Sequence, residues 1–352
     1  MAVFNVSNLE CRYKNSTHSV LQVEQLQIDE GEVVFFLGSS GVGKSTILET
    51  LGLMNNTIHS NSNTKLSFHE DTNEVDFLKI WQKKENLIAG FRKNNLSFIF
   101  QSTNLFPTLT AFENVKITTI LQDSDKTNIN QSELGALVDV LKSFLTTEKV
   151  QNILSKISNF NEAEAYNRIV KYLIKVFPKD TVEEILGVKY KLDNEGKLIK
   201  GKNGSVYESP KMITELSGGQ RQRLAFVRAV ASKYKVLLAD EPTGNLDEAN
   251  ADNLIAQLVD DVHQKSAIAI IVTHDIELAL KHADKIVFID KKQIEEKESK
   301  RHFGKISKAE TYIKNDNSKW ENAVDYITDN KPSFTSVDLQ KHFLEKIKTQ
   351  SN

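Results

Sequence analysis

The stretch Gly38-Ser39-Ser40-Gly41-Val42-Gly43-Lys44-Ser45 decides how the rest of this sequence is interpreted. It matches G-x-x-x-x-G-K-[ST], the pattern of a loop that holds nucleotide phosphates. The segment 32–37 before it, which is apolar after Glu32, is typical of a buried strand, and residues 46–51 after it are typical of the first turns of a helix. The motif therefore stands between a strand and a helix, which is the setting that a phosphate-binding loop requires.

The chemistry expected of this loop follows from its residue types. Gly38, Gly41 and Gly43 let the backbone turn tightly and approach a ligand closely. Successive backbone N–H groups at the N-terminus of the following helix favour an anion there. Lys44 is expected to reach the β- and γ-phosphates, and the Ser45 hydroxyl to bind Mg²⁺. The alternative is a glycine-rich turn with an unrelated lysine, but such a match arises by chance in on the order of one chain in a hundred.

Composition limits the class of protein. The chain has 352 residues, which predicts either one large domain with additions or two domains. A net charge of −2 gives no basic footprint, so no nucleic-acid partner is expected. The single cysteine, Cys11, excludes an internal disulfide and a cysteine-based zinc site.

Two features of the sequence predict a cytosolic location. Residues 1–6 lack the basic and apolar regions of a secretory signal. The apolar runs, such as residues 267–272, are too short to span a bilayer. If the protein acts at a membrane, another chain is expected to supply the membrane-spanning part.

The pattern of strands and helices predicts an α/β fold. Residues 2–10 and 20–28 are typical of two strands near the N-terminus. Beyond residue 217, strands alternate with helices, which indicates a parallel sheet covered on both faces. The predicted strands are 236–239, 268–272 and 286–289, and the predicted helices are 218–231, 249–262 and 276–283.

The middle and the end of the chain have a more polar composition. In the region 121–211, helical patterns persist, with Ile169, Val170, Leu173, Ile174 and Phe177 on one helix face. Glycines and asparagines within 190–207 predict a small hairpin. In the tail, 291–352, Leu339, Phe343, Leu344 and Ile347 mark an amphipathic helix. This helix either binds a partner or packs on its own domain, and we expect the second.

Two further motifs bear on chemistry. Residues 236–239 form an apolar strand that ends in Asp240 and Glu241. We expect Asp240 to hold the Mg²⁺ shell and Glu241 to polarise the attacking water, although an acidic strand end facing solvent is the simpler alternative. Ser217 is a good helix N-cap before Gly218 and Gly219, so the segment predicts either a second anion site or an ordinary capped turn.

The order of these motifs resembles that of the ATP-binding subunits of ATP-binding cassette (ABC) transporters. The resemblance covers residues 1–120 and 212–290. The matching positions are Tyr13, residues 38–46, Gln101, residues 216–220, Asp240 with Glu241, residues 245–247, and His274.

The resemblance implies a role for each nucleotide-binding position. Tyr13, which could otherwise be a packing residue, matches the aromatic that stacks on adenine. Residues 38–46, ending at Thr46, match the Walker A loop. Gln101 matches the glutamine that touches Mg²⁺ and the attacking water and reports the nucleotide state to the membrane partner.

The remaining positions are implied to serve hydrolysis and the dimer. Asp240 resembles the magnesium ligand of the Walker B motif, Glu241 the general base and His274 the residue that senses the γ-phosphate. Asp247 matches the loop that crosses the dimer interface. The family signature, which binds the γ-phosphate held by the opposite subunit, corresponds to Ser217, Gly218, Gly219 and Gln220.

The family resemblance also predicts an architecture and a mechanism. The expected fold is a P-loop NTPase core of ABC type, α/β with a parallel sheet and an antiparallel β part, formed by 1–120 and 212–290. A helical subdomain is expected at 121–211 and an extension at 291–352. Mg²⁺-dependent hydrolysis of ATP to ADP and phosphate takes place in two such domains, head to tail around two ATP. The chain has one loop and one signature, so a second subunit, identical or related, is required.

Residues 239–247, with 100–107 and 109–115, resemble one branch of the family. That branch comprises the lipoprotein-release, macrolide-export and cell-division ATPases. The interval from Gln101 to Leu216 and the tail beyond Asp290 are both longer than the branch needs. The added residues in 121–211 could enlarge the contact with a membrane partner, bind a regulator or be neutral.

Three functions are compatible with these motifs. The first is an ATPase subunit that drives an integral membrane partner from the inner face of the membrane. The second is a regulatory or scaffolding ATPase of a cell-envelope or division complex, in which ATP-driven dimerisation gates a partner. A soluble ABC ATPase of translation or DNA repair is disfavoured, because the chain has one cassette, no cysteine cluster and no basic stripe.

Overall fold

The computed structural model describes residues 2–14, 16, 18–70, 73–123, 162–187, 191–192, 198–199, 210–296, 299–324 and 332–351. The chain divides into two compact units. The sheet unit comprises Met1–Gln101, Tyr234–Pro242 and Ala249–Asn352, and the helical unit comprises Ser102–Lys233 and Thr243–Glu248.

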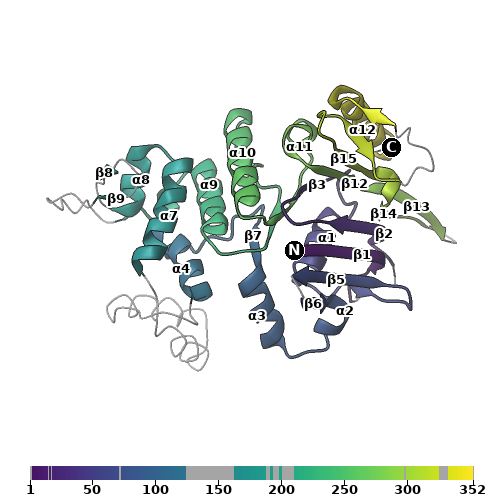
Figure 1. Ribbon diagram of the computed structural model, residues 1–352, viewed down its shortest axis with the longest axis horizontal. Coiled ribbons are helices and arrows are strands. Elements are labelled where there is room, and N and C mark those ends of the chain that lie inside the picture. Colours follow the sequence, from purple (N-terminus) through teal and green to yellow (C-terminus); the bar gives the residue numbers. More distant parts are fainter. Residues whose placement is uncertain are drawn as a thin grey trace. The chain divides into compact units, whose positions relative to one another are not determined.

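The larger sheet of the sheet unit has eight strands in the order β17-β16-β15-β12-β3-β11-β10-β7. Figure 1 labels β3, β7, β12 and β15 of this sheet. The five strands from β12 to β7 are parallel, as the alternation of strands and helices predicts. All residues of β3, β11 and β12 are buried, and their sequences are apolar throughout except for Lys285 in β12. The five are β12 (Lys285–Phe288), β3 (Val33–Leu37), β11 (Ile268–Val272), β10 (Val236–Asp240) and β7 (Leu96–Ile99).

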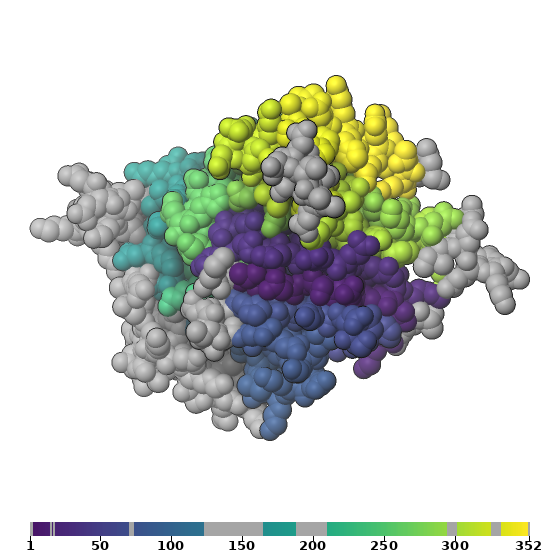
Figure 2. Space-filling model, turned by 45° about the vertical axis from the view of Figure 1, so that its right-hand side comes forward, coloured from purple at the N-terminus to yellow at the C-terminus, as the bar shows by residue number. Residues whose placement is uncertain are grey.

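A second, seven-stranded sheet contains the N-terminal strands, with the order β13-β14-β2-β1-β5-β6 and β4 paired with β1. In β2 the buried residues alternate with exposed ones over part of the strand, as expected where one face meets the core. Figure 2 shows the N-terminal residues as a purple band between the blue residues that follow them and the C-terminal residues. The strands are β1 (Ala2–Cys11), β2 (Leu21–Ile28), β4 (Ile58–His59), β5 (Lys65–Glu70), β6 (Asn73–Asp76), β13 (Asp290–Glu296) and β14 (Ser299–Ile306).

One hydrophobic core joins these two sheets and the helix α1 (Lys44–Leu51). Phe4 of β1 packs against Phe68 of β5, with ring centroids 4.9 Å apart. Ile47 and Leu51 place the buried face of α1 in the same core. The helix that begins at the phosphate loop is thereby held in place by both sheets. Further helices of the unit include α2 (Phe77–Ile80), α3 (Glu85–Asn95), α10 (Glu248–Gln264) and α11 (Ile276–His282).

The helical unit is built around α9 (Gly218–Val230), which packs against α4 (Ala111–Asp123) and α7 (Glu162–Val176). The predicted apolar face of α7 is buried at Ile169, Val170 and Leu173. Its further elements are α8 (Lys179–Leu186), η1 (Ile213–Glu215) and the pair β8 (Lys191–Leu192) and β9 (Leu198–Ile199). The antiparallel pairing of β8 with β9 confirms the predicted hairpin. Residues 124–161, 188–190, 193–197 and 200–209 of the expected 121–211 subdomain lie outside the described residues.

Part of the tail extends the larger sheet, whereas the sequence pattern predicts only one helix in a polar tail. After η2 (Lys308–Glu310), the strands β15 (Thr311–Lys314), β16 (Trp320–Asn322) and β17 (Ser333–Phe334) extend it antiparallel from β12. The helix α12 (Ser336–Ser351) then packs on its own unit, as expected, with Leu339 and Phe343 fully buried. Phe343 stacks on Phe288 of β12, with ring centroids 5.2 Å apart.

Candidate nucleotide-binding site

The phosphate loop connects β3 to α1 in the conformation that its glycines predict. Gly41 and Gly43 have positive φ angles of 74° and 95°. A Cβ atom on Gly43 would lie 3.3 Å from both the Leu21 Cβ and the Val20 carbonyl oxygen, so space as well as backbone conformation favours glycine. Gly43 caps α1 without a side-chain hydrogen bond, which leaves the N–H groups of the first turn available to an anion.

Lys44 lies across this loop. Its Nζ donates hydrogen bonds to the carbonyl oxygens of Gly38 and Ser39, at 2.8 and 3.1 Å. Burial lowers the pKa of Lys44, and the nearby carboxylates of Glu241 and Asp240 oppose that shift. The ammonium group is therefore held at the loop by backbone carbonyls and faces two carboxylates.

Ser45 and Asp240, which the sequence predicts to be metal ligands, contact each other. The Ser45 hydroxyl donates to Asp240 Oδ2 at 2.9 Å, although the two residues are 195 positions apart. The pKa of Asp240 is raised, chiefly by burial, although the Ser45 hydrogen bond and the charge of Lys44 oppose the shift. Both groups present oxygen ligands of the kind that Mg²⁺ prefers. Among the described residues, no group of three or more His, Cys, Asp or Glu side chains is placed to hold a metal ion.

Glu241 turns away from the line of β10. Its φ of 46° is left-handed, and its N–H donates to the Val272 carbonyl oxygen at 2.9 Å. The strand ends at Asp240, so the two adjacent carboxylates do not alternate across the sheet as they would within a strand. A left-handed residue other than glycine costs about 1–2 kcal/mol, a strain often found at functional sites. The backbone thus gives Asp240 and Glu241 different directions, as their proposed division of roles requires.

His274 lies next to Glu241. Its Nδ1 is 3.0 Å from Glu241 Oε2, and the Thr273 hydroxyl is 3.4 Å from the same oxygen. The Glu241 side chain is 14% exposed and that of His274 is 76% exposed. His274 follows β11 and precedes α11, whose N-cap Asp275 accepts from the Leu278 N–H. The carboxylate is therefore enclosed and oriented, while the imidazole is open to a ligand.

Two more predicted residues lie at the edges of this site. The Tyr13 hydroxyl is 3.2 Å from Thr46 Oγ1 and donates to Glu49 Oε2 at 3.0 Å. The side chain remains partly exposed beside the start of α1, and burial raises the pKa of its hydroxyl. Gln101 follows β7, whose Ile99 pairs with Ala239 of β10, so it lies at the same sheet edge as Asp240.

The predicted signature lies in the helical unit and begins α9. Ser217 Oγ accepts from the Gln220 N–H at 3.2 Å, and Gln220 Oε1 accepts from the Ser217 N–H at 2.9 Å. This reciprocal capping box fixes the start of the helix. Above Gly218 there is open space, whereas a Cβ on Gly219 would lie 3.3 Å from Leu246, in the loop that carries Asp247.

Sequence reasoning missed Arg228, a buried residue of α9. Its guanidinium group donates to the carbonyl oxygens of Asn104 at 2.6 Å and Thr103 at 2.7 Å. Both accepting residues have left-handed φ angles, 47° for Asn104 and 52° for Thr103. Burial lowers the pKa of Arg228 to about 10. The available signal was an arginine inside the apolar run 224–231, since a buried arginine needs a partner.

The segment that Arg228 holds begins two residues after Gln101. Arg228 therefore fixes, within the helical unit, the backbone that follows Gln101, the residue predicted to contact Mg²⁺ and water.

None of the helices in the described part of the chain combines the length and apolarity needed to cross a membrane.

Comparison with known proteins shows similarity to ATP-binding proteins. The family model described as ABC transporter matches residues 21–244. The lipoprotein-releasing system ATP-binding protein LolD of Shewanella frigidimarina is 29% identical, over 80% of this chain and 87% of that protein. The macrolide export ATP-binding/permease protein MacB of Rhodopirellula baltica is 29% identical, over 76% of this chain and 28% of that protein.

A solved structure shares the fold. It is the dimeric post-hydrolysis state of the ATP-binding cassette MJ0796 bound to ADP and Pi, with a TM-score of 0.51 and 22% identity. The match covers 81% of this chain and 93% of that chain. The predicted ABC-type α/β core is thereby confirmed.

Proposed function

The chain belongs to the ABC transporter family as an ATP-binding ATPase subunit, and from this premise we propose that two copies close around two ATP molecules and drive a conformational change in a transmembrane partner. The observation that carries this proposal is the convergence at the phosphate loop. Ser45 lies 2.9 Å from Asp240, and His274 lies 3.0 Å from Glu241. Lys44 interacts electrostatically with both carboxylates.

Binding of ATP begins at the loop. The phosphates accept hydrogen bonds from the N–H groups of the first turn of α1. Lys44 replaces its hydrogen bonds to the Gly38 and Ser39 carbonyl oxygens with hydrogen bonds to phosphate oxygens. Tyr13 stacks on the adenine. Ser45, Asp240 and Gln101 would hold Mg²⁺, which would neutralise charge on the β- and γ-phosphates. The residues present fit this ion, because a hydroxyl and a carboxylate already adjoin each other.

Hydrolysis is assigned to Glu241. As general base, it accepts a proton from the water that attacks the γ-phosphorus, while the bond from that phosphorus to the β–γ bridging oxygen breaks and ADP leaves. The contacts with Thr273 and His274 fix its carboxylate. The exposed imidazole of His274 is placed to contact the γ-phosphate. The carboxylate of Glu241 is thus oriented before the water binds, which favours the proton transfer.

The dimer supplies the rest of each site. Ser217, Gly218, Gly219 and Gln220 of one copy bind the γ-phosphate on the loop of the other, and Asp247 lies at the contact. The capped start of α9, with open space above Gly218, supports this role. We propose a homodimer, because one chain carries each half of the site once.

The membrane partner is inferred from the relatives. The names of LolD and MacB refer to lipoprotein release and macrolide export. We therefore place this subunit at the cytoplasmic face of a membrane, held there by its partner, where closure of the dimer drives export, lipoprotein release or transmission of force.

The proposal is tested with Glu241→Gln, which keeps the size of the side chain and removes the base. With ATP and Mg²⁺, steady-state hydrolysis should fall by at least about 10²-fold, and light scattering should detect a stable dimer. Glu85→Gln, at the exposed start of α3, is the matched control. Wild-type turnover in Glu241→Gln would remove the assignment of the base, and a monomer at saturating ATP would overturn the ATP-bound dimer.

The membrane role needs a separate measurement. The tagged chain, crosslinked in cells and isolated from membranes, should retain a protein with transmembrane segments. Recovery with nucleic acid and without any integral membrane protein would contradict the proposed partner while leaving the ATPase assignment intact.

A further inference from the structure

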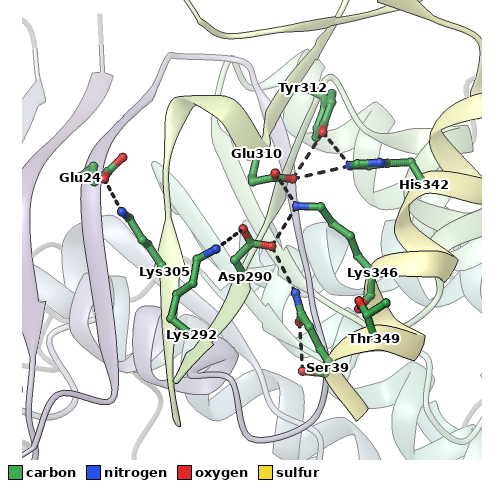
Figure 3. Close-up of polar contacts among 11 residues, drawn as sticks. Glu24, Ser39, Asp290, Lys292, Lys305, Glu310, Tyr312, His342, Lys346 and Thr349 are labelled. Carbon is green, nitrogen blue, oxygen red and sulfur yellow. Dashed lines mark hydrogen bonds and ion pairs between the residues drawn. The ribbon is translucent and has the colours of Figure 1, made fainter. Parts of the chain in front are cut away.

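The end of α12 lies against the segment that supports the phosphate loop. Lys346 Nζ donates to Asp290 Oδ1 at 2.9 Å and also pairs with Glu310. Gln350 Nε2 donates to the same Asp290 oxygen at 3.2 Å, and Lys292 approaches its other oxygen at 3.2 Å (Figure 3). Asp290 thus gathers three donors, two of which come from α12.

This cluster is shielded from solvent. The side chains of Asp290 and Glu310 are each 14% exposed, and that of Lys346 is 21% exposed. Lys346 also lies over the ring of Phe288, 5.4 Å from its centroid, on the residue against which Phe343 stacks. Burial raises the pKa of Asp290, but Lys346 and Lys292 outweigh it, so the net shift is downward. Partly buried contacts of this kind hold geometry better than exposed ion pairs.

From Asp290 the contact continues to the loop through one residue. The N–H of Ile289 donates to the Leu37 carbonyl oxygen at 2.8 Å, at the end of β3. The Ile289 carbonyl oxygen lies 3.0 Å from the position that a Cβ on Gly38 would occupy. The first residue of the phosphate loop therefore rests directly on the residue that precedes Asp290.

A second contact reaches the loop itself. The Ser39 hydroxyl lies 3.5 Å from Gln350 Oε1, a long hydrogen bond, while Lys44 binds the Ser39 carbonyl oxygen. The Gln350 carbonyl oxygen accepts from Lys291 Nζ at 2.8 Å, which anchors the last turn of α12. The same loop residue is therefore contacted by the phosphate-binding lysine and by the end of the tail helix.

We propose that Lys346 and Gln350 are positioning residues for ATP. Acting through Asp290 and Ser39, they hold the start of the phosphate loop in the conformation that accepts phosphates. Neither residue needs to touch the nucleotide. The tail helix thus contributes to nucleotide affinity, which gives a function to an extension longer than the family branch needs. This inference rests on ATP binding at the loop.

The test compares two variants with matched controls. Lys346→Met and Gln350→Ala should each raise the KM and the Kd for ATP by about threefold to tenfold, as expected when a charge-assisted contact is lost. The kcat at saturating ATP should stay within about twofold, because chemistry is performed elsewhere. Lys346→Arg should restore most of the affinity, and Lys348→Met, on the exposed side of α12, should leave it unchanged.

The outcomes separate this inference from the proposed function. Gln350 lies in the last turn of α12, so Gln350→Ala tests the inference even if Lys346→Met does not fold. If the wild type binds ATP and both folded variants bind it equally well, the positioning role is wrong. A fall in kcat at unchanged KM would also overturn it. If the wild type binds no ATP, the proposed function fails first.

Discussion

The imidazole Nδ1 of His274 lies 3.0 Å from the carboxylate Oε2 of Glu241. The two residues follow the ends of neighbouring parallel strands, Glu241 after β10 and His274 after β11, so the sheet itself brings them together. The left-handed φ of Glu241 completes the contact. The relationship predicts that the two side chains act as a unit.

We therefore expect His274→Ala to lower kcat by roughly 10²-fold, because Glu241 loses the group that orients it. Binding of ATP in the absence of turnover should change much less. The measurement is steady-state hydrolysis beside equilibrium ATP binding. In the double variant His274→Ala with Glu241→Gln, the losses should not add, and full additivity would show that the residues act independently.

The interaction of Arg228 with the Thr103 and Asn104 carbonyls predicts a stability effect in the helical unit. Arg228→Met keeps the bulk of the side chain but removes the donors to two backbone carbonyl oxygens. We expect a loss of about 1–3 kcal/mol in the free energy of unfolding, measured by urea denaturation. Arg228→Lys should recover only part of it, since an ammonium lacks the fork of the guanidinium group. Equal stability of all three proteins would disprove the role.

Tyr13 allows ring stacking to be separated from hydrogen bonding. Tyr13→Phe removes the contacts to Thr46 and Glu49 but keeps the ring, so the Kd for ATP should stay near the wild-type value. Tyr13→Ala should raise it by about threefold to tenfold, because the aromatic surface is lost. Isothermal titration measures both. If Tyr13→Phe raised the Kd for ATP more than Tyr13→Ala, the role of Tyr13 would be to support α1 and not to stack on the adenine.

Cys11 predicts a dependence of stability on alkaline pH. Burial raises the pKa of this thiol to about 11 in the folded protein, from an ordinary value of 9.0. Between these values the unfolded chain loses the proton and the folded chain keeps it, so stability falls as pH rises from about 9 to 11. The slope attributable to this group reaches at most about 1.4 kcal/mol per pH unit.

The measurement for Cys11 is urea unfolding at several pH values, with Cys11→Ala as the comparison. The variant should show a shallower decline over the same range. The native thiol should also resist alkylation at pH 8 until the protein is unfolded. Rapid alkylation of the native protein would show that Cys11 is accessible.

Much of the nucleotide site could be predicted, because each motif carries its own chemistry. The pair Ser45 and Asp240 follows from what a phosphate loop requires of a nearby acidic strand end, and the structure joins them at 2.9 Å. The buried parallel strands could be predicted because their residues are apolar without interruption. In these cases the local sequence and the tertiary position favour the same structure.

Other features depend on contacts that no local pattern reveals. Arg228 meets Asn104 from 124 positions away, and the left-handed backbone of Glu241 has no glycine to indicate it. The strand β13 is rich in lysine and glutamate, β14 is rich in basic residues, and β15, β16 and β17 are short, so their apolar periodicity is weak. Tertiary pairing forms these strands, whereas their composition indicates only a polar tail.

The three antiparallel strands beside β12 also affect the tendency of the protein to aggregate at high concentration. Without β15, the apolar strand Lys285–Phe288 would be an open sheet edge with unpaired N–H and C=O groups. Such edges recruit strands from other molecules and start aggregation. The tail moves that edge outward to β17, which has two residues. A shortened version of this chain that stops before residue 311 would therefore expose the unpaired edge of β12. It would be prone to aggregate during expression, which an assay of nucleotide binding would not reveal.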